Sequence, residues 1–217
     1  LDQCGDCKAS LGPERLKEEE VLSDAAKTED AQFSSEEFST QQLNRAVRLD
    51  WLVAFTYAHD CWDLPTWKVI RDIITEATRE NRSCYSDLPQ VKSYTGRADL
   101  YLVHCWGAKW GDMVMAAAHG SAPGCFVWLD AFALRQWPGN DAGVTTSIIH
   151  HTKACLVATS VPPMMTSRIN KEDMPAFMAS HGGQTANKVL PFRRVWCVLE
   201  MALASNSNVP IIFKAGQ

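Results

Sequence analysis

Four short apolar stretches decide the fold: Leu100-Tyr-Leu-Val-His-Cys105, Cys125-Phe-Val-Trp-Leu-Asp130, Ala154-Cys-Leu-Val-Ala-Thr159 and Val209-Pro-Ile-Ile-Phe213. Each stretch is apolar at almost every position, which is typical of strands whose two faces are both buried. Helical patterns separate the four stretches, so we expect parallel strands with crossover helices on both sides of the sheet. The sequence therefore predicts a small α/β domain built on a doubly wound parallel sheet.

The predicted helices are recognised by apolar residues that recur at three- and four-residue steps. The clearest example is the segment from Leu64 to Asn81, where Trp67, Ile70 and Ile74 share one face. Three further helices are expected at 112–119, at 140–151 with Asn140 or Asp141 as the cap, and at 191–204 with Pro191 as the first residue.

Charge and aromatic residues divide the chain of 217 residues into three parts. The first fifty residues hold 12 acids and 6 bases, and all eight tryptophans lie at or after Trp51. Residues 1–48 are therefore predicted to be an acidic, mobile tail. Residues 49–94 are predicted to be a helical extension that packs on the core, and residues 95–217 the α/β domain itself.

Composition excludes several classes of protein. The chain is 46% hydrophobic with a net charge of −4, and its basic residues form no cluster beyond Arg193-Arg194, so nucleic acid is not an expected partner. No run approaches the roughly 20 apolar residues that cross a membrane, and no signal peptide is recognisable. Six of the eight cysteines lie in apolar runs. Such cysteines are typical of buried free thiols, which favours a cytoplasmic protein.

Metal and thiol chemistry find little support in the sequence. The pair Cys4-Gly-Asp-Cys7 has the spacing of a zinc knuckle or redox motif, but no second pair accompanies it. The side chains of His150 and His151 diverge by about 100° on a helix. A thiol hydrolase that uses Cys105 beside His104 is set aside, because adjacent strand residues point to opposite faces.

Ligands of doubly wound sheets bind beyond the carboxyl ends of the strands. Those ends are His104-Cys105-Trp106 and Asp130 in the first two strands. No Gly-rich phosphate loop follows the first strand, which argues against a dinucleotide oxidoreductase and a P-loop NTPase. Asp130 is either a ligand-facing acid or a helix cap, and His104 either lines the site or packs in the core.

Glu200 interrupts an apolar stretch that runs from Val195 to Ala204 without another charge. Trp196 lies one helical turn earlier, so the indole and the carboxylate share a helix face. Two interpretations remain open at this point. Glu200 is either a carboxylate of a functional site or a surface acid paired with a base such as Arg193 or Lys214.

Three motifs resemble the TIR (Toll/interleukin-1 receptor) domain, in particular a divergent TIR-like group of algae and other protists. They are Val103-His104-Cys105-Trp106, Trp128-Leu129-Asp130 and Arg194-Val195-Trp196-Cys197-Val198-Leu199-Glu200. The likeness covers about residues 95–217 and implies a flavodoxin-like sheet. Val103 stands where the group has serine, and the segment from Val161 to Leu190 is longer than its equivalent. The given sequence stops after the fourth strand, so the resemblance implies a domain without the family's last strand and helix.

Many TIR domains hydrolyse NAD at the nicotinamide–ribose bond, and the resemblance implies that activity here, in signalling or defence. NAD would be the substrate, no cofactor or metal would be needed, and Glu200 would be the catalytic residue. The implied substrate-binding residues are His104, Cys105, Trp106, Lys109, Trp110, Asp130, Arg135, Trp137 and Trp196. TIR domains also self-associate, so a catalytically silent module that binds other TIR-like domains is the alternative.

Overall fold

The computed structural model describes residues 40–138, 144–160 and 171–216. The chain divides into two units, Leu1–Phe38 and Ser39–Gln217, and the described fold belongs to the second unit. Most of the predicted acidic tail, including Cys4 and Cys7, lies outside the described residues. The same holds for the predicted cap at Asn140 or Asp141 and for the first ten residues of the long segment that begins at Val161.

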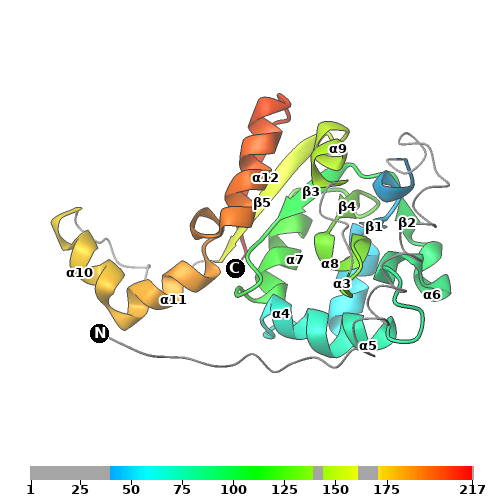
Figure 1. Cartoon of the computed structure of the whole chain (residues 1–217), viewed down its shortest axis with the longest axis horizontal. Helices are drawn as coiled ribbons and strands as arrows, with labels where there is room; N and C mark the ends of the chain where they lie inside the picture. The colour runs from blue at the N-terminus through cyan, green and yellow to red at the C-terminus, as the bar shows by residue number, and fades with distance from the viewer. Residues whose placement is uncertain (1–39, 139–143, 161–170, 217) are drawn as a thin grey trace, which may run out of the picture. The chain divides into compact units, whose positions relative to one another are not determined.

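Six strands of the described part form one mixed sheet, in the order β2-β1-β4-β3-β5-β6 (Figure 1). The four predicted strands are β3 (Leu100–Val103), β4 (Phe126–Trp128), β5 (Ala154–Ser160) and β6 (Ile211–Gly216). β3 pairs in parallel with β4 and β5, and β5 pairs in parallel with β6. Taken along the chain, these strands lie in the order second, first, third, fourth, which is compatible with a flavodoxin-like class.

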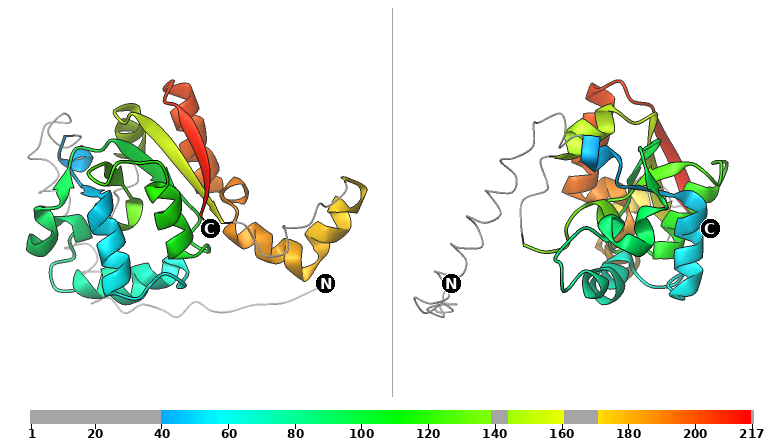
Figure 2. Two further views of the ribbon diagram at one scale, coloured as in Figure 1. Left: turned by 180° about the vertical axis from the view of Figure 1, so that it is seen from behind. Right: turned by 90° about the vertical axis from the view of Figure 1, so that its right-hand side faces the viewer.

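Two hydrophobic cores cover the two faces of this sheet, because successive strand residues point to opposite sides. Leu102 and Leu156 face the first core, which also contains the buried side of α7 (Trp110–Ala118). Tyr101 and Val157 face the second core, together with residues of α9 (Thr145–His150) and α12 (Val195–Asn206). The prediction of helices on both sides of the sheet is confirmed (Figures 1 and 2).

The sheet begins earlier in the chain than the sequence predicted. Ala46–Arg48 form β1, which pairs antiparallel with β4 and with β2 (Thr95–Gly96). Val47 lies opposite Val127 of β4 and is fully buried. The expected boundary of the tail at residue 48 therefore differs from the structure, in which residues 40–48 belong to the fold. The acidic average of the first fifty residues concealed this short apolar stretch.

Residues 49–94 form helices that build the first core. α3 (Leu49–Ala58) is followed by one continuous helical segment made of α4 (Thr66–Val69), a π-helical turn η1 (Ile70–Ile74) and α5 (Thr75–Ala77). This segment confirms the helix predicted between Leu64 and Asn81. A 3-10 turn η2 (Tyr85–Asp87) and α6 (Pro89–Lys92) complete the region. The ring centroids of Phe55 and Phe132 lie 5.1 Å apart, and this contact joins α3 to the helix that follows β4.

The remaining described helices lie after β4 and β5. α8 (Asp130–Ala133) begins directly after β4. The segment after β5 contains a 3-10 turn η5 (Lys171–Asp173), α10 (Met174–Ala179) and α11 (His181–Val189). Pro191 opens a 3-10 turn, η6 (Pro191–Arg193), and α12 itself begins at Val195. No helix in the described ranges has the length and apolar character that a membrane crossing requires.

Candidate functional site

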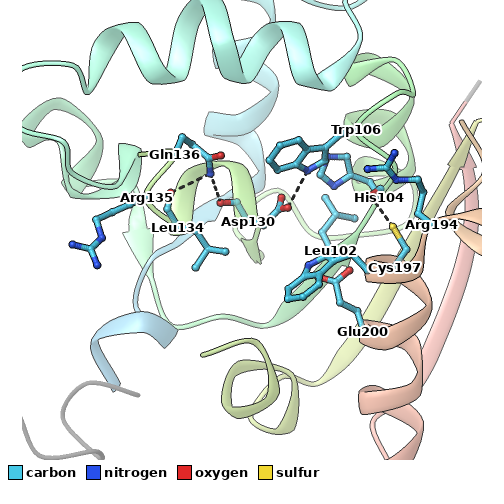
Figure 3. Close-up of a pocket in the computed structure, with 11 residues that line it drawn as sticks. Leu102, His104, Trp106, Asp130, Leu134, Arg135, Gln136, Arg194, Cys197 and Glu200 are labelled. Carbon is cyan, nitrogen blue, oxygen red and sulfur yellow. Dashed lines mark hydrogen bonds between the residues drawn. The ribbon is translucent and has the colours of Figure 1, made fainter. Parts of the chain in front are cut away.

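A cavity of about 370 Å³ opens beside the carboxyl ends of β3 and β4 (Figure 3). Its walls come from three parts of the chain: the end of β3 and the residues after it, the start of α8 with the loop that follows, and the first turns of α12. The lining residues are Leu102, His104, Trp106, Asp130, Leu134, Arg135, Gln136, Arg194, Trp196, Cys197 and Glu200. This is the edge of the sheet at which doubly wound domains bind ligands.

Glu200 stands on the side of α12 that faces the sheet. Cys197, Glu200 and Ala204 are the buried residues of this helix, and their spacing of three and four places them on one face. The Glu200 side chain is only 4% exposed. Its Oε1 accepts a hydrogen bond of 2.5 Å from the Tyr101 hydroxyl on β3. A carboxyl group therefore occupies a position at which a helix of this kind normally places an apolar side chain.

Burial determines the protonation of Glu200. Loss of hydration and, to a smaller extent, the nearby carboxylate of Asp130 raise the pKa of this carboxyl to about 8, although hydrogen bonds from the Tyr101 and Trp196 side chains oppose the shift. Within the described residues Glu200 forms no ion pair. At neutral pH the free protein consequently holds Glu200 mostly as the neutral acid.

Asp130 is fixed at the opposite wall. It is the first residue of α8, and its Oδ1 accepts a hydrogen bond of 2.7 Å from the backbone N–H of Ala131. Its Oδ2 accepts a bond of 3.0 Å from the indole N–H of Trp106 (Figure 3). Gln136 donates to the Asp130 carbonyl at 3.1 Å. Asp130 is therefore not the cap of α8, which is Leu129, and its carboxylate both hydrogen-bonds the first turn of the helix and lines the cavity.

His104 carries a polar atom without a partner. Its side chain is 6% exposed, and its Nε2 is buried with no hydrogen bond to any described residue. Burial lowers the pKa of His104, and the Asp130 carboxylate opposes that shift, so the ring is neutral at physiological pH. An unsatisfied buried polar atom costs about 1–3 kcal/mol. Because His104 lines the cavity, a bound ligand is the natural source of the missing hydrogen bond.

Six of the ten residues predicted for the site line this cavity: His104, Trp106, Asp130, Arg135, Trp196 and Glu200. Trp196 is 41% exposed, so its indole remains accessible to a ligand. Two arginines supply positive charge at the cavity, Arg135 after α8 and Arg194 just before α12. Figure 3 shows the Arg194 side chain beside His104, whereas Arg135 points away from the other labelled residues.

The structure does not bring the other four predicted residues to the cavity. The Cys105 thiol is buried and donates to the Lys188 carbonyl oxygen at 2.8 Å, and Lys109 forms an ion pair of 2.7 Å with Asp63. Trp110 is fully buried in the first core, where its indole N–H donates to the Thr56 hydroxyl at 2.9 Å. The Trp137 indole N–H donates to the Thr78 hydroxyl at 3.1 Å.

Sequence reasoning missed several residues that complete the site. Arg194 and Cys197 stand in the motif around Glu200, so the motif itself could have indicated them. Leu102 could have been inferred from its position near the end of a strand. Gln136 carries no such signal. Tyr101 is 99 positions away from Glu200 in the sequence, and only the folded chain brings its hydroxyl to the carboxyl group.

Metal-ligating side chains do not cluster within the described residues. No group of three or more His, Cys, Asp or Glu side chains is placed there as a metal ion would require. The six described cysteines are free thiols, and five of them are buried, as predicted. What the cavity offers is therefore two carboxyl groups, an unsatisfied imidazole nitrogen, two indoles and two guanidinium groups.

Comparisons with known proteins found no match: no protein-family model, no curated protein and no solved structure is significantly similar to the chain. A function for this protein consequently has to be inferred from the chemistry of the cavity and from the motifs in the sequence.

Proposed function

We propose that this protein cleaves NAD at the bond between nicotinamide and ribose, to give nicotinamide and ADP-ribose or its cyclic form. The observation that carries the proposal is the burial of Glu200 in a cavity that also exposes an indole, Trp196. The resemblance of residues 95–217 to TIR domains supports the same activity, because Glu200 occupies the position of their catalytic glutamate.

The chemistry requires stabilisation of positive charge on the sugar. When the C1′–N bond breaks, its electron pair moves to the ring nitrogen, nicotinamide leaves neutral, and the ribose becomes an oxocarbenium-like cation. The oxygen of water then bonds to C1′, and its proton passes to solvent. In its ionised form Glu200 would stabilise that cation, and its poor hydration strengthens the attraction.

The other lining residues suit the remaining parts of such a substrate. The indoles of Trp196 and Trp106 offer faces on which a cationic ring stacks. The unsatisfied Nε2 of His104 would hydrogen-bond the carboxamide or a ribose hydroxyl. Arg194 would bind the diphosphate at the mouth of the cavity. A volume of about 370 Å³ is near the lower end for ligand cavities, so we expect it to hold the nicotinamide riboside half of NAD.

The decisive test is the release of nicotinamide from NAD by the purified full chain at high protein concentration. We expect release by the parent protein and a loss of at least about 100-fold in Glu200→Ala, because charge-stabilising groups of active sites contribute on that scale. Glu76→Ala is the matched control, since Glu76 is an exposed acid ion-paired with Arg79 on the other side of the sheet.

Either of two results would contradict the proposal. Equal rates in the parent protein and in Glu200→Ala would show that the nicotinamide comes from another site or a contaminant. No release by any of the three proteins, each shown to be folded by circular dichroism, would remove the glycohydrolase activity.

A second candidate function has its own supporting observation. Large apolar side chains are exposed on η6, α12 and β6: Phe192, Val195, Val198, Leu199, Ile212 and Phe213. The rings of Phe192 and Phe213 lie 5.5 Å apart, so η6 and β6 contribute to one surface. Exposed apolar groups in such number favour a protein–protein contact. The alternative proposal is a TIR-like module that acts by self-association, with or without catalysis.

The proposed location follows from cysteine chemistry. Because the six described cysteines are free thiols, we propose a reducing compartment such as the cytoplasm. No basic side chain of the described part of the chain is assigned to the 2′-phosphate that distinguishes NADP from NAD, and we take NAD as the substrate to test first.

A further inference from the structure

The groups that act on the buried carboxyl group of Glu200 carry no positive charge, although the guanidinium groups of Arg135 and Arg194 also line the cavity. β3 contributes the Tyr101 hydroxyl, the segment after it contributes His104, and α8 contributes the Asp130 carboxylate. β5 contributes the Cys155 thiol and α12 contributes the Cys197 thiol. Both thiols interact electrostatically with Glu200. These side chains come from β3, the segment after it, α8, β5 and α12. α9, η6 and β6 also contact α12, and their ionisable residues, His150, Arg193 and Lys214, are not among the groups that act on the Glu200 carboxyl.

None of the Glu200 neighbours on β3, α8, β5, α12 and the segment after β3 becomes a cation near neutral pH. Burial raises the pKa of the Cys155 and Cys197 thiols to about 12 and raises that of Tyr101 well above its ordinary value, so all three stay neutral. Burial also lowers the pKa of His104. Arg194 acts on the Cys197 thiol but is not among the groups that shift the Glu200 carboxyl. Arg135 and Arg194 line the same cavity, but neither is among the groups that act on the Glu200 carboxyl, so the space beside this carboxyl is suited to a further cation.

The walls define which cation fits. The cavity of about 370 Å³ is lined by the indoles of Trp106 and Trp196, which attract the face of a planar cationic ring. His104 Nε2 lacks a hydrogen bond, so the ring should carry a polar substituent. An ammonium ion would lack the flat face, and a neutral ring would not stabilise the ionised form of the carboxyl group. A pyridinium ring with an amide substituent satisfies all three requirements.

We propose that Glu200 holds a proton in the free protein and releases it when a planar N-alkylpyridinium cation enters the cavity. The site thus exchanges one proton for one cationic ring. This inference deepens the proposed function, and it rests on that function only for the natural ligand, because the oxidised nicotinamide ring of NAD is such a cation.

The exchange has a physical basis in the pairing of charges. Ionisation of Glu200 alone would leave a buried anion beside Asp130, which is unfavourable. A cation in contact with the carboxylate offsets that penalty, and the displaced proton passes to the solvent. Nicotinamide and the dihydronicotinamide ring of NADH are neutral, so they cannot displace the proton. After cleavage the neutral product would allow Glu200 to take up a proton again, which weakens product binding.

The experiment compares two small probes of nearly the same shape, 1-methylnicotinamide and nicotinamide. The first is a cation without a glycosidic bond and the second is neutral, so neither is cleaved. Isothermal titration calorimetry of the full chain would measure affinity between pH 5.5 and 9, in buffers of different ionisation enthalpy. We expect the affinity for the cation to rise by about tenfold per pH unit below pH 8 and to level off above it, with close to one proton released.

Two variants sharpen the measurement. Glu200→Gln keeps the size of the side chain, and we expect it to abolish both the pH dependence and the proton release. Asp130→Asn removes the neighbouring negative charge, and we expect it to move the pH at which the affinity levels off to lower values. Glu76→Gln, which changes an exposed acid, should behave as the parent protein.

The outcomes separate this inference from the proposed activity. Affinity for the cation that does not change with pH, pH dependence that persists in Glu200→Gln, or no binding of the cation by folded protein would each overturn the inference. If the cation binds with proton release but NAD is not cleaved, the activity fails and the exchange stands. If NAD is cleaved without proton-linked cation binding, the exchange fails and the activity stands.

Discussion

Helices α7 and α12 cover opposite faces of the same sheet, and they place their side chains in opposite ways. α7 buries Trp110, Met113 and Val114 in the first core, and the large apolar side chain that it exposes is Met115. α12 turns Glu200 toward the sheet and exposes apolar side chains, among them Val195, which is 87% exposed. α7 therefore buries its apolar side, as a helix that covers a sheet normally does. α12 instead buries a carboxyl group and exposes apolar side chains.

This difference indicates that α7 serves the stability of the fold and that α12 serves its function. The face covered by α7 is closely packed, with the rings of Trp110 and Phe132 5.6 Å apart in an edge-on arrangement. α12 instead contributes Trp196, Cys197 and Glu200 to the cavity at the carboxyl edge of the sheet, where Glu200 has a raised pKa and His104 Nε2 is unsatisfied. A buried acid and exposed apolar groups both reduce stability, so their presence on one helix indicates that α12 serves binding or catalysis.

The largest expected difference between the two helices comes from replacing one tryptophan on each, Trp110 on α7 and Trp196 on α12. Trp110→Ala should lower the free energy of unfolding by about 3–5 kcal/mol, because it opens a large cavity in the first core. Trp196→Ala should change it by less than about 1 kcal/mol, because Trp196 is partly exposed. Urea denaturation followed by circular dichroism measures both effects.

The activity should follow the opposite order in the same two proteins. Trp196→Ala, although stable, should lose most of the release of nicotinamide, whereas the folded fraction of Trp110→Ala should retain it at low temperature. Equal loss of stability in the two variants would show that the two faces do not differ in the way that the burial pattern indicates.

A smaller effect concerns the dependence of stability on pH. The folded protein keeps the Glu200 proton up to about pH 8, whereas the unfolded chain loses it near the ordinary value of 4.5. The parent protein should therefore lose stability as the pH rises from about 4.5 to 8. Over pH 5 to 8, Glu200→Gln should gain on the order of 2–4 kcal/mol relative to the parent protein, because the amide does not ionise.

The measurement is the midpoint of urea denaturation at several pH values, with Glu76→Gln as the control that keeps the slope of the parent protein. Parallel pH profiles for Glu200→Gln and the parent would show that Glu200 is not a buried neutral acid. Such a result would also remove the physical basis of proton exchange at the cavity.

The parallel part of the fold could be predicted because its signal is local. β3, β4 and β5 are short runs in which almost every residue is apolar, and their alternation with helices fixes the parallel arrangement. β1 and β2 contain only three and two residues, too few for any periodicity to be recognised. β6 was expected to be buried on both faces, but Phe213 is 54% exposed because this strand lies at the edge of the sheet.

The site was predictable where topology alone decides a position. The carboxyl ends of parallel strands meet at one edge, which brings His104 and Asp130 to the same cavity. Glu200 was recognisable because a charge stands in an apolar stretch. Trp110 was misplaced because it lies only a few residues after β3, yet it belongs to the first turn of α7 and is buried within the first core. Closeness to a strand in the sequence therefore does not determine whether a side chain reaches the cavity or the core.

The smallest expected effect on stability tests the outer side of the two helices. Val195→Asp and Met115→Asp each place a charge on an exposed apolar position, and each should change the free energy of unfolding by no more than about 0.5 kcal/mol. Val195 opens α12, where an acid is favourable at the positive end of the helix dipole. If the exposed apolar groups of α12 mediate self-association, Val195→Asp should weaken it by at least about tenfold and Met115→Asp should not, as sedimentation velocity over a range of concentrations would show. If the parent protein and both variants associate equally, the exposed apolar side chains of α12 have no role in self-association. The cavity alone would then explain why α12 buries a carboxyl group and exposes apolar side chains.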